Sequence, residues 1–223
     1  MSLSDDLRAQ AADVWEAQHR HPFVTGVGDG TLPPDVFRFW VRQDYVFLIE
    51  YGRALALAAA RAPDLATMRR FADLAHETLG TEMDLHRSFS ADLGITPEEL
   101  EAEPMAPTTR AYTDFLVRTA AHGDFAEAAA ALLPCMWGFS EVGRRLAERP
   151  RPADPRFAAW IDLYASDEFA ELAGWCRGVV DRAGEDLGAR GRAAMARAFV
   201  ASSRYELAFW EMAFDERPGR PRA

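Results

Sequence analysis

Helical periodicity constrains the fold of this chain more than any other feature of its sequence. Apolar residues recur at spacings of three and four along most of its 223 residues, and no stretch shows the apolar–polar alternation of a half-buried strand. We therefore expect an all-α fold, a single-domain helical bundle. The predicted helices cover residues 5–19, 34–62, 65–93, 97–103, 108–122, 125–149, 155–164, 167–185 and 189–214.

Local signals predict where several helices begin and end. A capping box spans Thr96–Glu99, with proline at the first helical position. Gly123–Asp124 combines a helix-ending glycine with a residue that favours a new helix start. Residues 26–34 are rich in glycine and predict a loop, and three prolines within 149–155 predict a second break.

Composition and charge exclude several classes of partner. Acidic residues outnumber basic ones, 35 to 25, which argues against nucleic acid and an anionic membrane surface. The first residues lack the pattern of a signal peptide, and no apolar run is long enough to span a bilayer. Cys135 and Cys176 predict neither a disulfide framework nor a metal site. Because disulfide frameworks are typical of secreted proteins, we expect a cytoplasmic protein.

No linker between domains is evident in the sequence. We therefore expect one domain over residues 1–216 and a frayed basic tail over 217–223.

A cysteine beside a proline is the first candidate for a functional residue. Pro134 interrupts a helical pattern, removes a backbone donor and favours a bend. Cys135 lies next to that bend, on the helix face that also carries Phe139. A single buried cysteine is most often a small hydrophobic residue, so its chemistry depends on its neighbours.

Two carboxylates lie on apolar helix faces. Asp44 and Glu206 each share a stripe with aromatic and aliphatic residues. Residues two apart are separated by about 200° around a helix, so Arg42 and Arg204 point away from them. Burial disfavours the charged form of a carboxylate, and such a group can hold or transfer a proton near neutral pH.

These residues fall within motifs that together resemble the TenA/thiaminase II family. Each motif is modest alone, but their order and spacing are specific. They are His21–Val24, Gly28–Leu32, Arg42–Leu48, Glu82 with His86, Leu133–Gly138, Tyr164–Phe169 and Tyr205–Ala213.

The resemblance implies a haem-oxygenase-like all-α fold, a homotetramer and the hydrolysis of thiamin-derived aminopyrimidines without a cofactor or metal. It implies that Cys135 is the nucleophile, that Asp44 holds the exocyclic amine and a ring nitrogen, and that Glu206 contacts the other ring nitrogen. The residues that we expect to bind the substrate are Phe47, Tyr112, Phe139, Tyr164 and Trp210.

Two departures from the family pattern keep other functions open. Phe47 and Phe139 stand where tyrosine is common in the family, so a shifted substrate or a non-catalytic pyrimidine-binding role is an alternative. A third possibility is an iron oxidase on the same scaffold, because Glu16 and His19 have the Glu-x-x-His spacing and Asp73–His76 the related Asp-x-x-His spacing.

Overall fold

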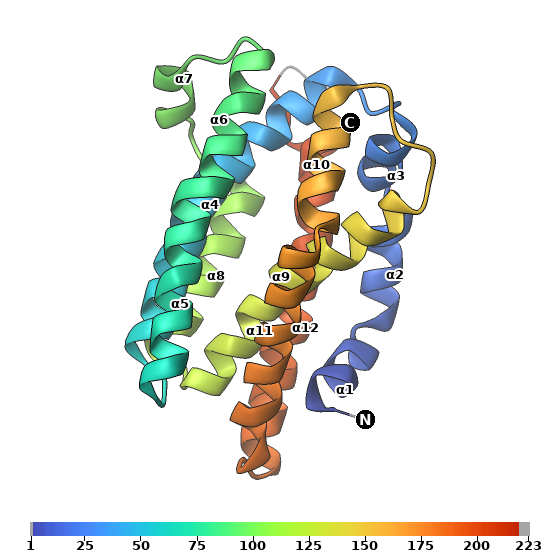
Figure 1. Ribbon diagram of the computed structural model, residues 1–223. Helices are drawn as coiled ribbons and strands as arrows, with labels where there is room; N and C mark the ends of the chain where they lie inside the picture. The colour runs from blue at the N-terminus through green and yellow to red at the C-terminus, as the bar shows by residue number, and fades with distance from the viewer. Residues whose placement is uncertain (1, 219–223) are drawn as a thin grey trace. The chain divides into compact units, whose positions relative to one another are not determined.

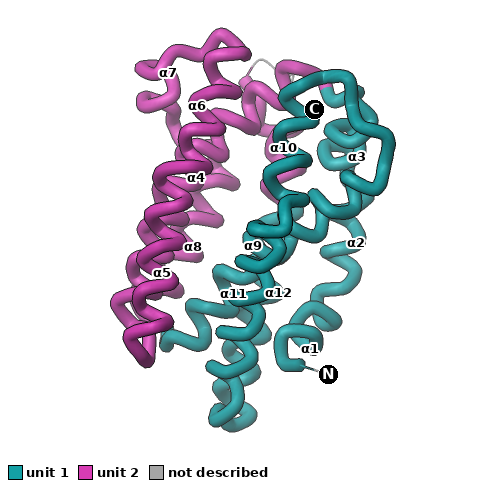
Figure 2. The backbone as a smooth tube through the Cα atoms, viewed as in Figure 1, with its two compact units in different colours: residues 1–32, 123–207 teal, residues 33–122, 208–223 magenta. Residues whose placement is uncertain are grey.

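The computed structural model describes residues 2–218, and every regular element in that range is helical. This confirms the all-α prediction (Figure 1). The chain forms two compact units, one of residues 1–32 and 123–207 and the other of residues 33–122 and 208–223 (Figure 2). The single domain over 1–216 stays a prediction, and residues 219–223 of the predicted tail lie outside the described residues.

Unit 1 is built around a long helix that contains the candidate cysteine. This helix, α9, packs against α10 and α11, and α1 packs against α11. The bounds of the unit 1 helices are α1 Leu3–Gln10, α2 Ala12–Arg20, α3 Pro22–Asp29, α9 Phe125–Ala147, α10 Pro155–Ala165 and α11 Asp167–Glu185.

Unit 2 is built around α4, which contains the candidate aspartate. This helix packs against α5, α6, α7 and α8. Helix α12, Ala189–Asp215, belongs to unit 1 as far as Leu207 and to unit 2 from Ala208. The other elements of unit 2 are α4 Pro34–Ala60, α5 Leu65–Glu77, the π-helix η1 Thr78–Glu82, α6 Met83–Asp92, α7 Pro97–Glu101 and α8 Pro107–His122.

The capping signals appear where the sequence predicts them. Thr96 and Glu99 form both hydrogen bonds of the capping box that opens α7. Asp124 accepts a hydrogen bond from the Glu127 backbone at the start of α9. Each cap satisfies a backbone N–H group that has no partner within the helix, so both helices start at the predicted positions.

The predicted loop over residues 26–34 is wrong in its first half, because α3 extends to Asp29. His21 caps this helix by accepting a hydrogen bond from the Phe23 backbone, and Pro22 has the torsion that suits a first helical residue. The side chains of Phe23, Val24 and Val27 are buried. Burial of this apolar face outweighs the poor helix propensity of its glycines.

Two predicted helices are interrupted. The predicted helix 5–19 is divided at Ala11, which closes α1 and precedes α2. The predicted helix 65–93 contains the wide turn of η1 between α5 and α6. A π-turn closes one residue later than an α-turn, so it changes which side chains of α6 face α4.

A buried glutamine fixes the start of α8 against α4. Gln43 accepts hydrogen bonds from the Ala106 backbone N–H and the Thr109 hydroxyl, both at 2.8 Å. Its amide nitrogen donates to Glu103 at 2.9 Å and to the Pro104 carbonyl at 3.0 Å. These four bonds satisfy the Gln43 side chain, and they hold the segment before α8 beside the candidate aspartate.

Candidate functional site

Asp44 lies on the buried face of α4 and pairs with a histidine. Its side chain is almost completely buried, and its Oδ2 atom lies 2.5 Å from Nε2 of His86 on α6. The other ring nitrogen, Nδ1, donates to the Glu82 carbonyl at 2.9 Å. Arg42, the nearest cation in sequence, instead pairs with Glu103. The predicted inward orientation of Asp44 is therefore confirmed.

Charge and burial act in opposite directions on the His86 imidazole. Burial lowers its pKa, but the charge of Asp44, the hydrogen bond to Asp44 and the charge of Glu82 raise it more. The net effect raises the pKa of His86 above its ordinary value of 6.5. The protonated ring is therefore favoured by its neighbours in unit 2.

Aromatic rings of unit 2 form two groups, one that includes the His86 ring and one around Phe47. Trp40 lies with its ring centroid 5.8 Å from that of His86 and stacks on Trp210 at 5.9 Å. Phe47 contacts Tyr112 at a centroid distance of 5.0 Å. Unit 2 thus brings Asp44 into one connected cluster with Trp210 through His86 and Trp40, and it brings Phe47 together with Tyr112.

Unit 1 contains the candidate nucleophile and the second carboxylate. Cys135 is partly exposed on α9 and is not in a disulfide, and Cys176 on α11 is buried. The helix continues through Pro134. Glu206 on α12 is 3% exposed, which confirms the burial predicted from its apolar stripe.

Phe139, which lies one turn after Cys135 on α9, packs against Tyr164, a predicted substrate-binding residue. Phe139 lies 4.8 Å from Tyr164 and 5.9 Å from Trp160, measured between ring centroids. Gly143, one turn further along α9, allows α10 to approach closely. A Cβ atom at that position would lie 2.6 Å from the Tyr164 carbonyl carbon. The glycine therefore permits the contact that places Tyr164 beside α9.

The opposite face of α9 is held by aromatic and arginine contacts. Trp137, two residues after Cys135, meets the edge of Trp15 at a centroid distance of 5.1 Å. The guanidinium of Arg177 lies over the Trp137 ring at 4.1 Å, a cation–π arrangement. Trp15 donates a hydrogen bond to the Ser203 hydroxyl at 2.9 Å. Because residues two apart point in nearly opposite directions, these contacts fix the direction in which Cys135 points.

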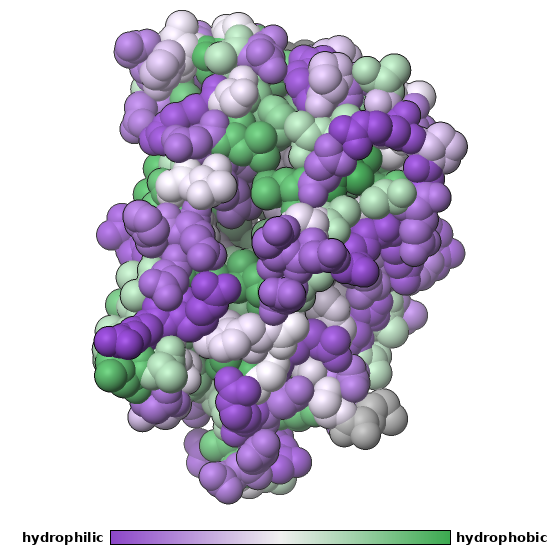
Figure 3. Space-filling model, viewed as in Figure 1, coloured by the Kyte–Doolittle hydropathy of each residue, from purple (hydrophilic) through white to green (hydrophobic). Residues whose placement is uncertain are grey.

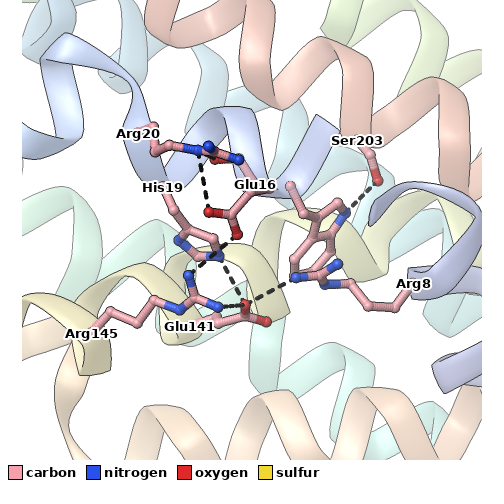
Figure 4. A network of polar contacts seen from close by, with 8 residues as sticks. Arg8, Glu16, His19, Arg20, Glu141, Arg145 and Ser203 are labelled. Atoms are coloured by element: carbon pink, nitrogen blue, oxygen red, sulfur yellow. Dashed lines mark hydrogen bonds and ion pairs between the residues drawn. The ribbon is translucent and has the colours of Figure 1, made fainter. Parts of the chain in front are cut away.

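Further along α9, an ion-pair network joins Glu141 to residues of α1 and α2 (Figure 4). Glu141 accepts from Arg8 at 3.1 Å and contacts His19 Nε2 at 2.8 Å, and Arg145 lies 3.3 Å away. Burial raises the pKa of Glu141, but hydrogen bonds from His19 and Arg8 and their charges outweigh it and lower the pKa to about 2. Glu141 is therefore ionised and ties α9 to α1 and α2.

Glu16 and His19, two residues of the iron-oxidase alternative, take part in the same ion-pair network. Glu16 contacts Arg20 at 3.2 Å and Arg145 at 3.7 Å, and His19 contacts Glu141 (Figure 4). Within residues 2–218, no three His, Cys, Asp or Glu side chains gather as a group of metal ligands. In the described part of the chain, Glu16 of the predicted Glu-x-x-His motif pairs with arginine and His19 pairs with Glu141.

His86 is a neighbour of Asp44 to which sequence reasoning assigned no role, although it belongs to one of the family motifs. Its spacing from Glu82 places both on one turn, but no pattern in the sequence pairs it with Asp44, 42 positions earlier. The relevant signal is a polar residue among the apolar positions of the predicted 65–93 helix, where Met83 and Phe89 are also buried. A buried histidine requires partners for its ring nitrogens, and that requirement could have identified it.

The fold is that of the haem-oxygenase-like helical proteins. A protein of Shewanella denitrificans described as a domain of unknown function with a heme oxygenase-like fold is similar with a TM-score of 0.74 at 15% identity, covering 95% of this chain and 92% of that one. The TenA homologue of P. horikoshii OT3 is similar with a TM-score of 0.89 at 31% identity, covering 96% and 99%. These likenesses confirm the fold predicted from the family resemblance.

The chain belongs to the TENA/THI-4/PQQC family, whose sequence model matches residues 8–216. It is 44% identical to the aminopyrimidine aminohydrolase of Halalkalibacterium halodurans, over 97% of both chains. It is 41% identical to the aminopyrimidine aminohydrolase of Bacillus subtilis, over 96% of this chain and 90% of that protein. No helix in residues 2–218 combines the length and hydropathy needed to cross a bilayer.

Proposed function

We propose that this protein is an aminopyrimidine aminohydrolase of thiamin salvage. It would convert 4-amino-5-aminomethyl-2-methylpyrimidine and water into the hydroxymethylpyrimidine and ammonia, and would cleave thiamin as a slower reaction. The observation that carries this proposal is the 44% and 41% identity, over nearly the full chain, to two proteins of that name.

Cys135 is the proposed nucleophile, and Glu206 the proposed proton donor. Glu206 protonates a ring nitrogen, which makes the pyrimidine electrophilic. The Cys135 thiolate adds to the ring carbon next to the one that bears the methylene group, and the amine leaves as ammonia. Water adds to the exocyclic methylene, and loss of the thiolate restores the aromatic ring. This is covalent catalysis by a thiol, and the burial of Glu206 supports its role because burial favours the protonated carboxyl.

Asp44 and five aromatic residues are the proposed binding groups. Asp44 accepts a hydrogen bond from the amino group of the substrate and contacts a ring nitrogen. A planar pyrimidine is suited to stacking against aromatic rings. The rings proposed to contact it are those of Phe47, Tyr112, Phe139, Tyr164 and Trp210, which are all buried.

Substitution of the nucleophile tests the proposed reaction. Cys135→Ser should abolish most release of ammonia from the aminomethylpyrimidine, because a hydroxyl is a far weaker nucleophile than a thiolate at neutral pH. Substrate-induced thermal stabilisation should be retained. Cys176→Ser is the matched control, since it removes the buried thiol of α11 in the same unit. Unchanged hydrolysis in Cys135→Ser would contradict covalent catalysis by this residue.

A shifted substrate is the second candidate function. Phe47 and Phe139 carry no hydroxyl, and their rings pack on Tyr112 and Tyr164 respectively. Aromatic rings without these hydroxyls would favour a less polar substituent on the pyrimidine. A panel of aminopyrimidines distinguishes the candidates: a preference for an apolar substituent over the aminomethyl compound would favour the second.

We also propose a homotetramer in the cytoplasm. Leu65, Met68 and Leu79 are 63%, 41% and 46% exposed, and a hydrophobic patch is visible over the start of α5 (Figure 3). Exposed apolar residues of this kind mark protein–protein contacts, and a reactive thiol stays reduced in the cytoplasm. Sedimentation should give a tetramer that Met68→Glu weakens. A wild-type monomer at micromolar concentration would contradict the proposed assembly.

A further inference from the structure

The two ring nitrogens of His86 are both engaged, and this determines where their protons lie. The imidazole is completely buried. Its Nδ1 faces the Glu82 carbonyl, and a carbonyl oxygen can only accept a hydrogen bond. Nδ1 therefore carries a hydrogen. The remaining nitrogen, Nε2, lies 2.5 Å from Oδ2 of Asp44, a distance that requires a proton between them.

The pair accordingly holds one proton that either partner can carry. If His86 is neutral, its Nε2 bears a lone pair and Asp44 must be protonated. If Asp44 is ionised, the ring must be an imidazolium with a hydrogen on each nitrogen. In both arrangements the pair is neutral overall, so Asp44 does not stand as an uncompensated buried charge.

The surroundings of the pair favour keeping that proton. The rings of Trp40 and Phe89 lie beside the imidazole, and the other charge that acts on it is Glu82. Helix α7, which also packs on α6, directs its Glu101 to the hydroxyl of Tyr45. Electrostatic interactions are stronger in apolar surroundings than in water, and the raised pKa of His86 agrees with this environment.

We propose, on the basis of the proposed function, that His86 is a positioning residue that fixes the Asp44 carboxyl through its Oδ2 atom and a shared proton. The other oxygen, Oδ1, is then directed at the amino group of the substrate. A carboxyl group without this bond can rotate about its last side-chain torsion, which is broad and roughly two-fold. His86 thus removes a motion that substrate binding would otherwise have to restrict.

Proton NMR tests the shared proton without any measurement of activity. The wild-type protein should give an imidazole N–H resonance far downfield of the amide signals, retained above pH 6.5, the ordinary pKa of histidine. His86→Gln should remove this resonance. His76→Gln should retain it, because His76 is an exposed histidine of α5 in the same unit. Absence of a downfield signal that depends on His86 would overturn the shared proton.

Kinetics test the positioning role with two variants of different hydrogen-bonding ability. His86→Phe keeps a ring but removes both bonds, so KM for the aminomethylpyrimidine should rise about tenfold or more. His86→Gln keeps an amide donor that can reach Asp44, so KM should return to within about threefold of the wild-type value. His76→Gln should match the wild type in both KM and kcat.

The outcomes separate the positioning role from the proposed reaction. A KM in His86→Gln as high as in His86→Phe, or unchanged in both, would overturn the positioning role while leaving the reaction intact. A wild-type protein that hydrolyses no aminopyrimidine would overturn the proposed function. In that case the NMR titration still decides the shared proton, and thermal shifts with the aminopyrimidine compare the binding of the two variants.

Discussion

A pair of glycine-to-alanine substitutions tests how closely α9 and α10 are packed. Alanine at position 143 would place a Cβ atom 2.6 Å from the Tyr164 carbonyl carbon, 2.8 Å from Tyr164 Cβ and 2.8 Å from the Ala165 nitrogen. Two of these three atoms belong to the backbone, so no side-chain rotation relieves the contact. Gly143→Ala must therefore move the end of α10 away from α9.

The expected loss of stability follows from two opposing effects. Restoring ordinary van der Waals contact requires a shift of about 0.8 Å, and overpacking of this kind costs about 1–3 kcal/mol. Alanine also gains about 1 kcal/mol over glycine in a helix. The net change in the free energy of unfolding should be a loss of about 0–2 kcal/mol. Displacement of Tyr164 should also lower aminopyrimidine hydrolysis.

Gly174 provides the matched control in the same unit. It lies within α11, and a Cβ there would meet no atom within 4 Å. Gly174→Ala should stabilise the protein by about 0.5–1 kcal/mol. Urea unfolding of both variants and the wild type measures the difference, about 1–3 kcal/mol in total, because both variants share the gain in helix propensity. Equal changes in the two variants would refute the argument from close backbone approach.

Three further predictions follow from other contacts. Gln43→Met should lower the free energy of unfolding in urea by about 2–4 kcal/mol because it leaves buried hydrogen-bonding groups without partners, whereas exposed Gln10→Met should change it little. Glu141→Gln should lose about 1–2 kcal/mol at pH 7 after allowance for partial exposure. Because the folded pKa of Glu141 is lowered from 4.5 to about 2, this difference should be complete above pH 4.5 and disappear as the pH falls towards 2. Phe139→Tyr should raise hydrolysis without lowering Tm, and a loss of both would favour the shifted substrate.

The long helices could be predicted because pattern and capping agree along them. The predicted ranges 34–62 and 125–149 lie within two residues of α4 and α9 at both ends. Helix α3 was missed because its two glycines suggested a loop, while the burial of its apolar side chains depends on contacts distant in sequence. The break at Ala11 has no local signal, since alanine is the strongest helix former.

For the candidate site, the sequence could predict which residues are buried on each helix face, but not which of them contact one another. Burial of Asp44 and Glu206 follows from their apolar stripes and is confirmed. The contact between Asp44 and His86 could not be predicted, because it depends on how α4 and α6 are rotated and aligned against one another. Helical periodicity specifies the buried face of each helix, but not which residue lies opposite which. The roles of Cys135, Asp44 and Glu206 stay predictions until they are measured.

The wide turn of η1 has a consequence for insertions and deletions in this chain. Its extra residue sets the rotation of α6, so that His86, Met83 and Phe89 are buried together. Because the wide turn takes up one extra residue, removing one residue from 78–82 would leave a regular α-turn and keep α6 in nearly the same rotation. A deletion inside α6 itself would instead rotate the residues that follow it by about 100° and exchange buried with exposed positions. Homologues should therefore tolerate a single-residue deletion within 78–82 far better than one within α6.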